Sequence, residues 1–299
     1  MHLTVGIFGN QDLAKKLGKK DTINDIAIYS HSSSEGVFTY ICPNSEKIQS
    51  LLQVLNMIDV PVLIIDNLTK EIGEMIVGIN EMNFEKGFIV TDIRDTIQPL
   101  IKNTCLEKFE IIGENDLWPK LLSFNIERHD DFLMIPIDNY FNVKGVGTVI
   151  LGIIKSGKIS LHEKLIVEPI GKEVIAKGIQ SQDKDIEEAG SGMRIGLNIK
   201  GVEVEELKRG FVIVKDKVEK SSEIVIKFKK NRFFKQEIKQ DIPVLLSIGL
   251  QVVSCTIEST GSELKLKSDQ KIAYRKNQRC IVASQNDIMP RIIGNGIII

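Results

Sequence analysis

The chain has 299 residues, of which 42% are hydrophobic and 26% are charged. This length suits two or three domains, and the composition excludes a disordered chain, a collagen and a coiled-coil rod. The formal net charge of −1 hides an uneven distribution: −6 over residues 1–128 (12 Lys and Arg against 18 Asp and Glu), −2 over residues 129–216 (12 against 14) and +7 over residues 217–299 (15 against 8). The basic last third indicates either a polyanionic partner or an ordinary solvated, lysine-rich surface.

Residues 1–128 alternate between strand and helix patterns. Short apolar runs predict strands, and apolar residues at helical spacing predict helices between them. The expected strands are residues 3–9, 37–41, 59–66, 87–90 and 107–113, and the expected helices are residues 12–18, 45–57, 72–80 and 96–103. Strands and helices that alternate in this way form a mostly parallel sheet, so we predict a Rossmann-like α/β domain over residues 1–128.

The pattern changes near residues 125–131, after which helical spacing almost disappears. Short β-branched runs with glycine or charged turns between them are typical of closed β-barrels. In the middle block these runs are residues 132–137, 147–154, 164–167, 173–180, 192–197 and 211–214. In the last block they are residues 224–230, 243–248, 252–258, 263–266, 278–282 and 290–297. We predict two all-β barrels, over residues 129–216 and 217–299, which pack closely because no low-complexity linker separates the blocks.

The middle block carries a specific run of residues. It begins with FNVKGVGTV at residues 141–149 and continues with SGKI at 156–159, KGIQ at 177–180 and EEAGSGMRIGLNIKG at 187–201. This order of turns and strands resembles the second domain of the translational GTPases: elongation factor Tu and, more closely, the selenocysteine-specific elongation factor. The ending PRIIGNGI at residues 290–297 resembles the closing strand of the third domain in the same family.

The resemblance implies that residues 1–128 are a GTPase domain with a P-loop-NTPase-like fold. In that family a loop of the form GxxxxGK[S/T] holds the phosphates, and its hydroxyl binds Mg²⁺. This chain has Gly9 in the first position, Ala14 in place of the second glycine, Lys15 as the lysine and Lys16 in place of the hydroxyl. The resemblance therefore gives Gly9, Ala14 and Lys15 as a degenerate nucleotide-binding site. The ammonium group of Lys16 cannot bind the metal.

Two further motifs of the family are altered. The stretch aligned with DxPGH is ICPNS at residues 41–45, which lacks the acid, the glycine and the histidine. The guanine-reading motif, NKxD or TKxD, falls on TDIR at residues 91–94, where Arg94 replaces the aspartate. Asp95 supplies that acid only if one residue is inserted. The segment before residue 41 is also too short for the complete first switch region of the family.

These changes favour a domain that keeps the fold without the chemistry. Phosphoryl transfer depends on positioning and on the neutralisation of charge, and the altered residues supply neither. We interpret residues 1–128 as a pseudo-GTPase domain that has no catalytic residue, no metal site and no required cofactor. Weak binding of GTP or GDP through Gly9 and Lys15 stays open. So does the alternative of a divergent GTP-binding enzyme whose motifs have moved along the chain.

The resemblance also implies a class of partner. In the family the second domain helps to hold the 3′ end of a charged transfer RNA, so Lys144 and Arg194 are the candidate RNA-binding residues, although each also fits a plain surface charge. The expected partners are transfer RNA, the ribosome or another translation factor, with no membrane and no DNA among them. In a third alternative the protein is a scaffold that regulates an authentic elongation factor. The acidic first block favours that alternative, because a charge of −6 opposes docking onto RNA.

Other residue types indicate little chemistry. The histidines and cysteines are scattered and lack metal-ligand spacing: His2, His31, His129, His162, Cys42, Cys105, Cys255 and Cys280. No apolar run approaches the roughly 20 residues of a membrane-spanning helix, and no signal-peptide pattern opens the chain. We expect a reducing, cytoplasmic location without disulfides or structural zinc, and a buried, inert thiol at Cys42 rather than a nucleophile.

Overall fold

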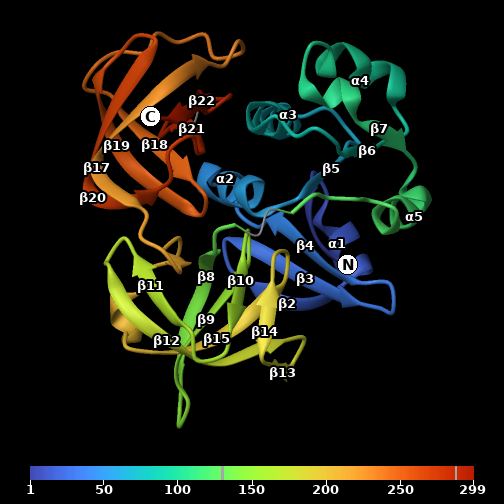
Figure 1. The fold of residues 1–299 in the computed structure, drawn as a ribbon. Helices are drawn as coiled ribbons and strands as arrows, with labels where there is room; N and C mark the ends of the chain where they lie inside the picture. Colours follow the sequence, from blue (N-terminus) through green and yellow to red (C-terminus); the bar gives the residue numbers. More distant parts are fainter. Residues whose placement is uncertain (129–130, 287) are drawn as a thin grey trace.

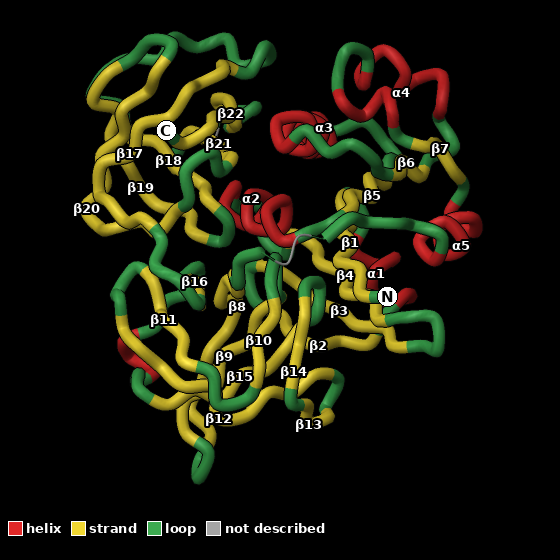
Figure 2. Tube along the Cα trace, viewed as in Figure 1, coloured by secondary structure: helices red, strands yellow, loops and turns green. Residues whose placement is uncertain are grey.

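The computed structural model describes residues 1–128, 131–286 and 288–299. They form a mixed sheet with helices, followed by two β-barrels (Figure 1), and nearly all of the helix lies in the first part (Figure 2). This arrangement confirms the predicted fold class. His129, the first residue of the second predicted block, lies outside the described residues. Within the described residues, no helix has the length and apolar character needed to cross a membrane.

The first sheet has seven strands in the order β2-β3-β4-β1-β5-β6-β7. β1 lies at the centre and pairs in parallel with β4 and β5, and the parallel pairing continues through β6 to β7. At the other edge, β2, β3 and β4 pair in an antiparallel manner. The strands are β1 (His2–Phe8), β2 (Lys19–Ile23), β3 (Ile26–Ser32), β4 (Val37–Pro43), β5 (Val60–Ile64), β6 (Phe88–Val90) and β7 (Glu110–Ile112).

Five helices cover the two faces of this sheet because side chains alternate along the strands. In β1, Phe8 packs with α2, α3 and α4, whereas Val5 and Ile7 pack with α1 and α5. The helices are α1 (Gln11–Leu17), α2 (Ile48–Met57), α3 (Lys70–Met82), α4 (Arg94–Ile101) and α5 (Leu117–Leu122). The predicted helices before β4, β5, β6 and β7 are therefore present, with ends that differ by a few residues.

The segment between α1 and β4 differs from the sequence-based expectation, which placed no strand there. β3 is buried through Tyr29 and lies between β4 and the exposed strand β2. The two strands extend the sheet in the place where the family resemblance implied a switch region. This edge of the sheet faces the second domain, and it carries residues of the interdomain contact described below.

The second domain is a barrel. Its sheet follows the order β11-β16-β8-β9-β15-β12-β13, and the pairing of β11 with β12 closes the ring. Each predicted run in this block coincides with a strand, and the short strands β10, β13 and β14 were not expected. The strands are β8 (Met134–Val143), β9 (Gly147–Ile153), β10 (Lys158–Ser160), β11 (Lys164–Glu168), β12 (Lys172–Ser181), β13 (Lys184–Ile186), β14 (Glu188–Gly190), β15 (Arg194–Lys200) and β16 (Val212–Val214).

The third domain is a closed barrel with the strand order β17-β20-β19-β18-β21-β22. All six predicted runs coincide with strands, although β17 and β20 extend several residues further than the apolar pattern. The strands are β17 (Glu219–Lys230), β18 (Pro243–Ile248), β19 (Gln251–Ser259), β20 (Glu263–Tyr274), β21 (Arg279–Ser284) and β22 (Ile292–Ile298).

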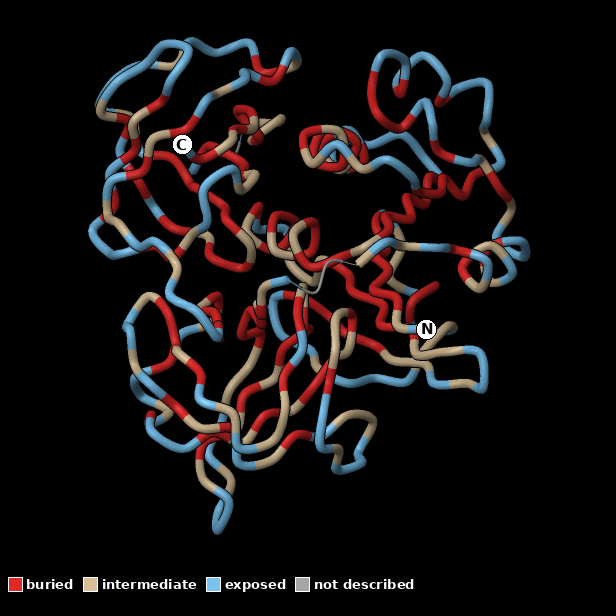
Figure 3. The backbone as a smooth tube through the Cα atoms, viewed as in Figure 1, coloured by how far each residue is buried: buried red, intermediate tan, exposed pale blue. Residues whose placement is uncertain are grey.

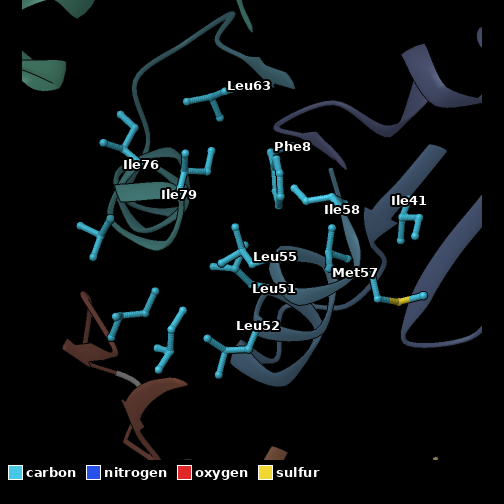
Figure 4. Packing of buried hydrophobic residues seen from close by; sticks show 14 of the residues in the cluster. Phe8, Ile41, Leu51, Leu52, Leu55, Met57, Ile58, Leu63, Ile76 and Ile79 are labelled. Atoms are coloured by element: carbon cyan, nitrogen blue, oxygen red, sulfur yellow. The ribbon is translucent and has the colours of Figure 1, made fainter. Parts of the chain in front are cut away.

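One apolar cluster joins the first and third domains. Leu51, Leu52 and Leu55 of α2 lie beside Ile76 and Ile79 of α3 (Figure 4), and buried chain lines the contact between α2 and the third barrel (Figure 3). The barrel contributes Leu245, Leu250, Ile281, Ala283 and Ile292 to the same cluster. Gly78 of α3 permits this approach, because a Cβ atom there would lie 2.8 Å from a methyl group of Leu55 and 3.2 Å from one of Ile292.

Polar contacts reinforce the junctions between domains. The buried Glu74 of α3 accepts hydrogen bonds from the backbone nitrogen of Arg291 (2.7 Å) and from its Nε (3.0 Å). At the junction with the second domain, Asp59 accepts a hydrogen bond from Arg128 at 2.8 Å, and the Nζ of Lys155 lies 3.7 Å from its other oxygen. Because these carboxylates are buried and paired, they hold the three domains in a defined arrangement.

Candidate functional site

The turn after β1 is the place where a phosphate-binding loop would begin. Gly9 has a φ of +91°, and a Cβ atom there would lie 2.1 Å from the carbonyl oxygen of Ile64, so only glycine fits. The side chain of Asn10 then accepts a hydrogen bond from the backbone nitrogen of Asp12 (2.9 Å) and caps α1. Because α1 already begins at Gln11, residues 11–16 form helix rather than an extended loop around a ligand.

The structure separates the three residues of the predicted nucleotide site. Gly9 lies in the turn, whereas Ala14 is fully buried in the apolar cluster between α1 and the sheet. Lys15 is exposed, and its Nζ lies 2.7 Å from a carboxylate oxygen of Asp12 on the same helix. This hydrogen bond and the charge of Asp12 raise the pKa of Lys15. Of the three predicted residues, Ala14 thus contacts the core and Lys15 contacts a neighbouring side chain.

The hollow beside this turn is small and acidic. It lies at the carboxyl ends of β1, β5, β6 and β7 and has a volume of about 90 Å³. Pockets for small molecules and cofactors are typically about 300–1,000 Å³. The charged side chains around it are Asp66, Asp92, Glu114 and Lys16, and Lys16 is paired with Glu114 at 3.0 Å. Three carboxylates and one compensated ammonium group give a poor electrostatic environment for a triphosphate.

The residues aligned with the other two family motifs have structural contacts in the described chain. Ile41 and Cys42 are buried in β4, and the carbonyl of Pro43 accepts a hydrogen bond from the side chain of Gln11. Thr91 is buried, and its hydroxyl donates to the carbonyl oxygen of Ile65 at 2.7 Å. Among the residues that the structure describes, no group of three or more His, Cys, Asp or Glu side chains could hold a metal ion.

The candidate RNA-binding residue Arg194 is an interdomain contact. Its side chain is buried, with the residue only 6% exposed, and it bonds to Asp138 of its own barrel and to Asp21 of β2 (Nε–Oδ2, 2.7 Å). Burial opposes the charge of Arg194, but the two carboxylates outweigh it and raise the pKa of the guanidinium. In this arrangement the guanidinium joins the first and second domains instead of facing solvent.

The other candidate, Lys144, lies at the exposed tip of the hairpin between β8 and β9. Phe141 and Val146 flank it and are also exposed. β9 pairs with β15 so that Ile153 faces Arg194, while Lys144 lies beyond the opposite end of β9. At about 3.3 Å per residue, the strand keeps the two candidates roughly 20 Å apart, so they do not form one site.

The thiol of Cys42, within the altered DxPGH stretch, is buried, as are the other three cysteines. Burial raises the pKa of Cys42 to about 12, that of Cys105 to about 11, and those of Cys255 and Cys280 to about 12. Because the thiolate is the reactive form, these rises lower its fraction about 100-fold for Cys105 and about 1,000-fold for the other three cysteines. We expect no thiol to react with Ellman's reagent at pH 8 in the folded protein and all four to react in guanidinium. A rapidly reacting thiol in the folded protein would contradict this prediction.

Comparisons with known proteins agree with the architecture. The family model for elongation factor Tu domain 2 matches residues 147–214. The crystal structure of translation elongation factor SelB from Methanococcus maripaludis, in complex with the GTP analogue GppNHp, superposes with a TM-score of 0.82 at 21% identity, over 99% of this chain and 78% of that chain. A bacterial selenocysteine-specific elongation factor superposes equally well, over 58% of its length.

Two relatives extend the similarity to sequence. The uncharacterized protein MJ0325 of Methanocaldococcus jannaschii is 34% identical over 98% of both chains. The fold and these similarities define the class: the chain is a translational GTPase-like protein, homologous to the selenocysteine-specific elongation factors. Within it, the selenocysteine-specific elongation factor of M. jannaschii is 30% identical over 83% of this chain. The chain spans about half of that factor, since the match covers 52% of its length.

Proposed function

We propose that the protein is a translation-factor relative that has lost GTP hydrolysis and acts in the cytoplasm by binding RNA or another component of the translation machinery. The observation that carries this proposal is the small, acidic hollow at the place of the nucleotide. Its volume of about 90 Å³ lies well below the roughly 300–1,000 Å³ of typical pockets for small molecules and cofactors. A GTP molecule would require α1 to unwind and the pair between Lys16 and Glu114 to separate.

The chemistry of the motifs supports the same proposal. Hydrolysis of GTP needs Mg²⁺ to neutralise the phosphates and a side chain to orient the attacking water. Lys16 occupies the place of the metal-binding hydroxyl, and Ile41 and Ser45 occupy the places of the acid and of the histidine. With neither function supplied, the first domain would act as a structural partner of the two barrels.

A nucleotide titration tests the loss of GTP binding. We expect no saturable binding of a fluorescent GTP analogue up to about 100 μM, with or without Mg²⁺, because the hollow admits no triphosphate. An authentic elongation factor measured in parallel serves as the positive control. Micromolar binding that depends on Mg²⁺ would instead favour the alternative of a divergent GTPase with relocated motifs.

A filter-binding assay with unfractionated transfer RNA tests the RNA part. We expect binding that strengthens steeply as salt falls from 200 to 50 mM, because each phosphate contact releases counterions. If the protein does not bind at the lowest salt, the RNA part of the proposal is wrong. The remaining candidate would then be a scaffold that contacts another translation factor, which the charge of −6 on residues 1–128 favours.

A further inference from the structure

The exposed apolar side chains of this protein gather at two places. Nine large apolar side chains of the described residues are exposed. Three of them line one groove: Leu68, Leu100 and Ile288, the last of which is 63% exposed. Two more, Phe141 and Val146, lie at the tip of the hairpin between β8 and β9. Single exposed apolar side chains are common on protein surfaces, whereas gathered ones mark contact surfaces.

The groove lies between α3, α4 and the third barrel and has a volume of about 890 Å³. Three residues that line it, Ile72, Ile76 and Val77 of α3, belong to the apolar cluster that joins the first and third domains. Phe233 of the third domain also lines the groove and packs against the same cluster. The groove is thus the open end of a domain junction, where a surface suited to apolar packing faces solvent.

Gly73 leaves space in this groove. It is exposed on α3, and a Cβ atom there would meet no heavy atom within 4 Å from another part of the chain. Its backbone nitrogen donates to the carbonyl oxygen of Thr69 at 3.1 Å, so it takes part in the regular helix. A glycine inside a helix costs about 0.5–1 kcal/mol relative to alanine. No contact among the described residues accounts for this cost, whereas the close approach of another chain would.

The hairpin tip is a narrow projection without cover. The backbone nitrogen of Val146 donates to the carbonyl oxygen of Val143 at 3.0 Å and closes the turn. Gly145 and Gly147 have φ values of +82° and +101°, and a Cβ atom at either would meet no heavy atom within 4 Å beyond its chain neighbours. The charged side chain of the tip is Lys144, which is exposed. The tip therefore presents two apolar side chains and one cation on a slender backbone.

The tip points away from the first domain, so it does not fill the groove of its own chain. Ile153, at the other end of β9, packs in the apolar cluster of the first domain. At about 3.3 Å per residue, β9 places the tip roughly 20 Å beyond this contact. A second copy of the chain can bring a tip to the groove.

We propose that the protein forms a homodimer in which the hairpin tip of each copy lies in the groove of the other. Phe141 and Val146 cover the exposed apolar side chains of the groove, and Lys144 lies near Glu71, an exposed carboxylate at its rim. The rim also carries Lys70, so the apolar contact supplies most of the binding. Each copy has one tip and one groove, and a two-fold arrangement uses both at once and closes the assembly. This proposal goes beyond the proposed function and does not depend on it.

Sedimentation velocity at about 100 μM protein tests the dimer. We expect a species of twice the chain mass of 33.5 kDa. The tip variant, Phe141→Ser with Val146→Ser, and the groove variant, Gly73→Arg, should each weaken dimerisation at least tenfold. Gly73→Arg should fold normally, because the position is open and arginine favours a helix. Circular dichroism checks the folding of both variants.

Two matched controls accompany these variants. Ile170→Ser changes a side chain of similar exposure that lies outside the tip and the groove, and Ser34→Arg adds a cation at an exposed turn of the first domain. Both should dimerise within threefold of the unmodified protein. If the unmodified protein is a monomer, or if the controls weaken the dimer as much as the tip and groove variants do, the proposal is wrong.

A photo-crosslink locates the contact. The variant Phe141→p-benzoylphenylalanine is prepared in isotope-labelled and unlabelled form and the two are mixed before irradiation. Mixed-label crosslinks should join the tip to peptides that carry the groove residues, Leu68 or Leu100 among them. Crosslinks confined to other surfaces overturn the contact between tip and groove even if a dimer forms. A monomer that binds transfer RNA would leave the proposed function intact, and a dimer that binds none would leave this proposal intact.

Discussion

Replacing Arg194 with alanine is expected to lower the free energy of unfolding by about 3–5 kcal/mol, because the change leaves a buried carboxylate without its partner. Asp138 is almost fully buried and accepts two hydrogen bonds from this guanidinium, one of them at 3.3 Å. Asp21 would also lose its bond across the domain junction. Urea denaturation followed by circular dichroism measures the loss as a lower transition midpoint.

Two further variants give this prediction its control. Lys144→Ala removes an exposed cation at a hairpin tip and should change the stability by less than about 0.5 kcal/mol. The double variant Arg194→Met with Asp138→Leu removes the unpaired charge together with its partner, so it should recover part of the loss. If Arg194→Ala is as stable as Lys144→Ala, the buried pair does not stabilise the junction and the interpretation of Arg194 is wrong.

The second large effect concerns the junction of the first and third domains. Glu74→Ala should cost about 3 kcal/mol, because three nitrogen atoms of Arg291 lose their carboxylate acceptor while its side chain is only 12% exposed. The loss should be local to the contact between α3 and β22. Hydrogen exchange followed by mass spectrometry should therefore show faster exchange in the peptides that contain these two elements, with the second barrel unchanged.

Glu71→Ala is the matched control, since Glu71 is exposed on the same helix and its carboxylate bonds within the first turn. The hydrogen bond from Thr69 lowers the pKa of Glu71, which means that the charged carboxylate favours the folded state. Glu71→Ala should therefore cause a small loss of stability near neutral pH. This loss should be much smaller than the loss caused by Glu74→Ala. If Glu71→Ala and Glu74→Ala accelerate exchange equally, the pair with Arg291 has no special role in holding the domains together.

The sequence predicted the barrels better than the edge of the first sheet, for a physical reason. Buried strands in a barrel carry regular apolar alternation, which is visible in a single sequence. The edge strand β2 reads KKDTI and is mostly exposed, so it lacks such a pattern. Its partner β3 reads IAIYSHS and has a clear strand composition, yet the sequence analysis placed no strand there.

The candidate sites show a similar limit. The position of Gly9 in a tight turn after a strand could be predicted from its neighbours, and the structure has that turn. The burial of Arg194 could not, because arginine is rarely buried unless it is paired. Its partners, Asp138 and Asp21, are 56 and 173 residues away in the sequence. Only the packing of two domains brings these groups together, and no local spacing signals it.

The apolar cluster shared by α2 and the third barrel has a consequence for how this chain can be divided. Leu245, Ile281 and Ile292 belong to that cluster rather than to the interior of their own barrel. If the chain were cut at the end of the second barrel, the isolated third barrel would expose these side chains to water and would tend to aggregate. The third barrel is therefore not an interchangeable module, and a chimera that transplants it must carry α2 and α3 as well.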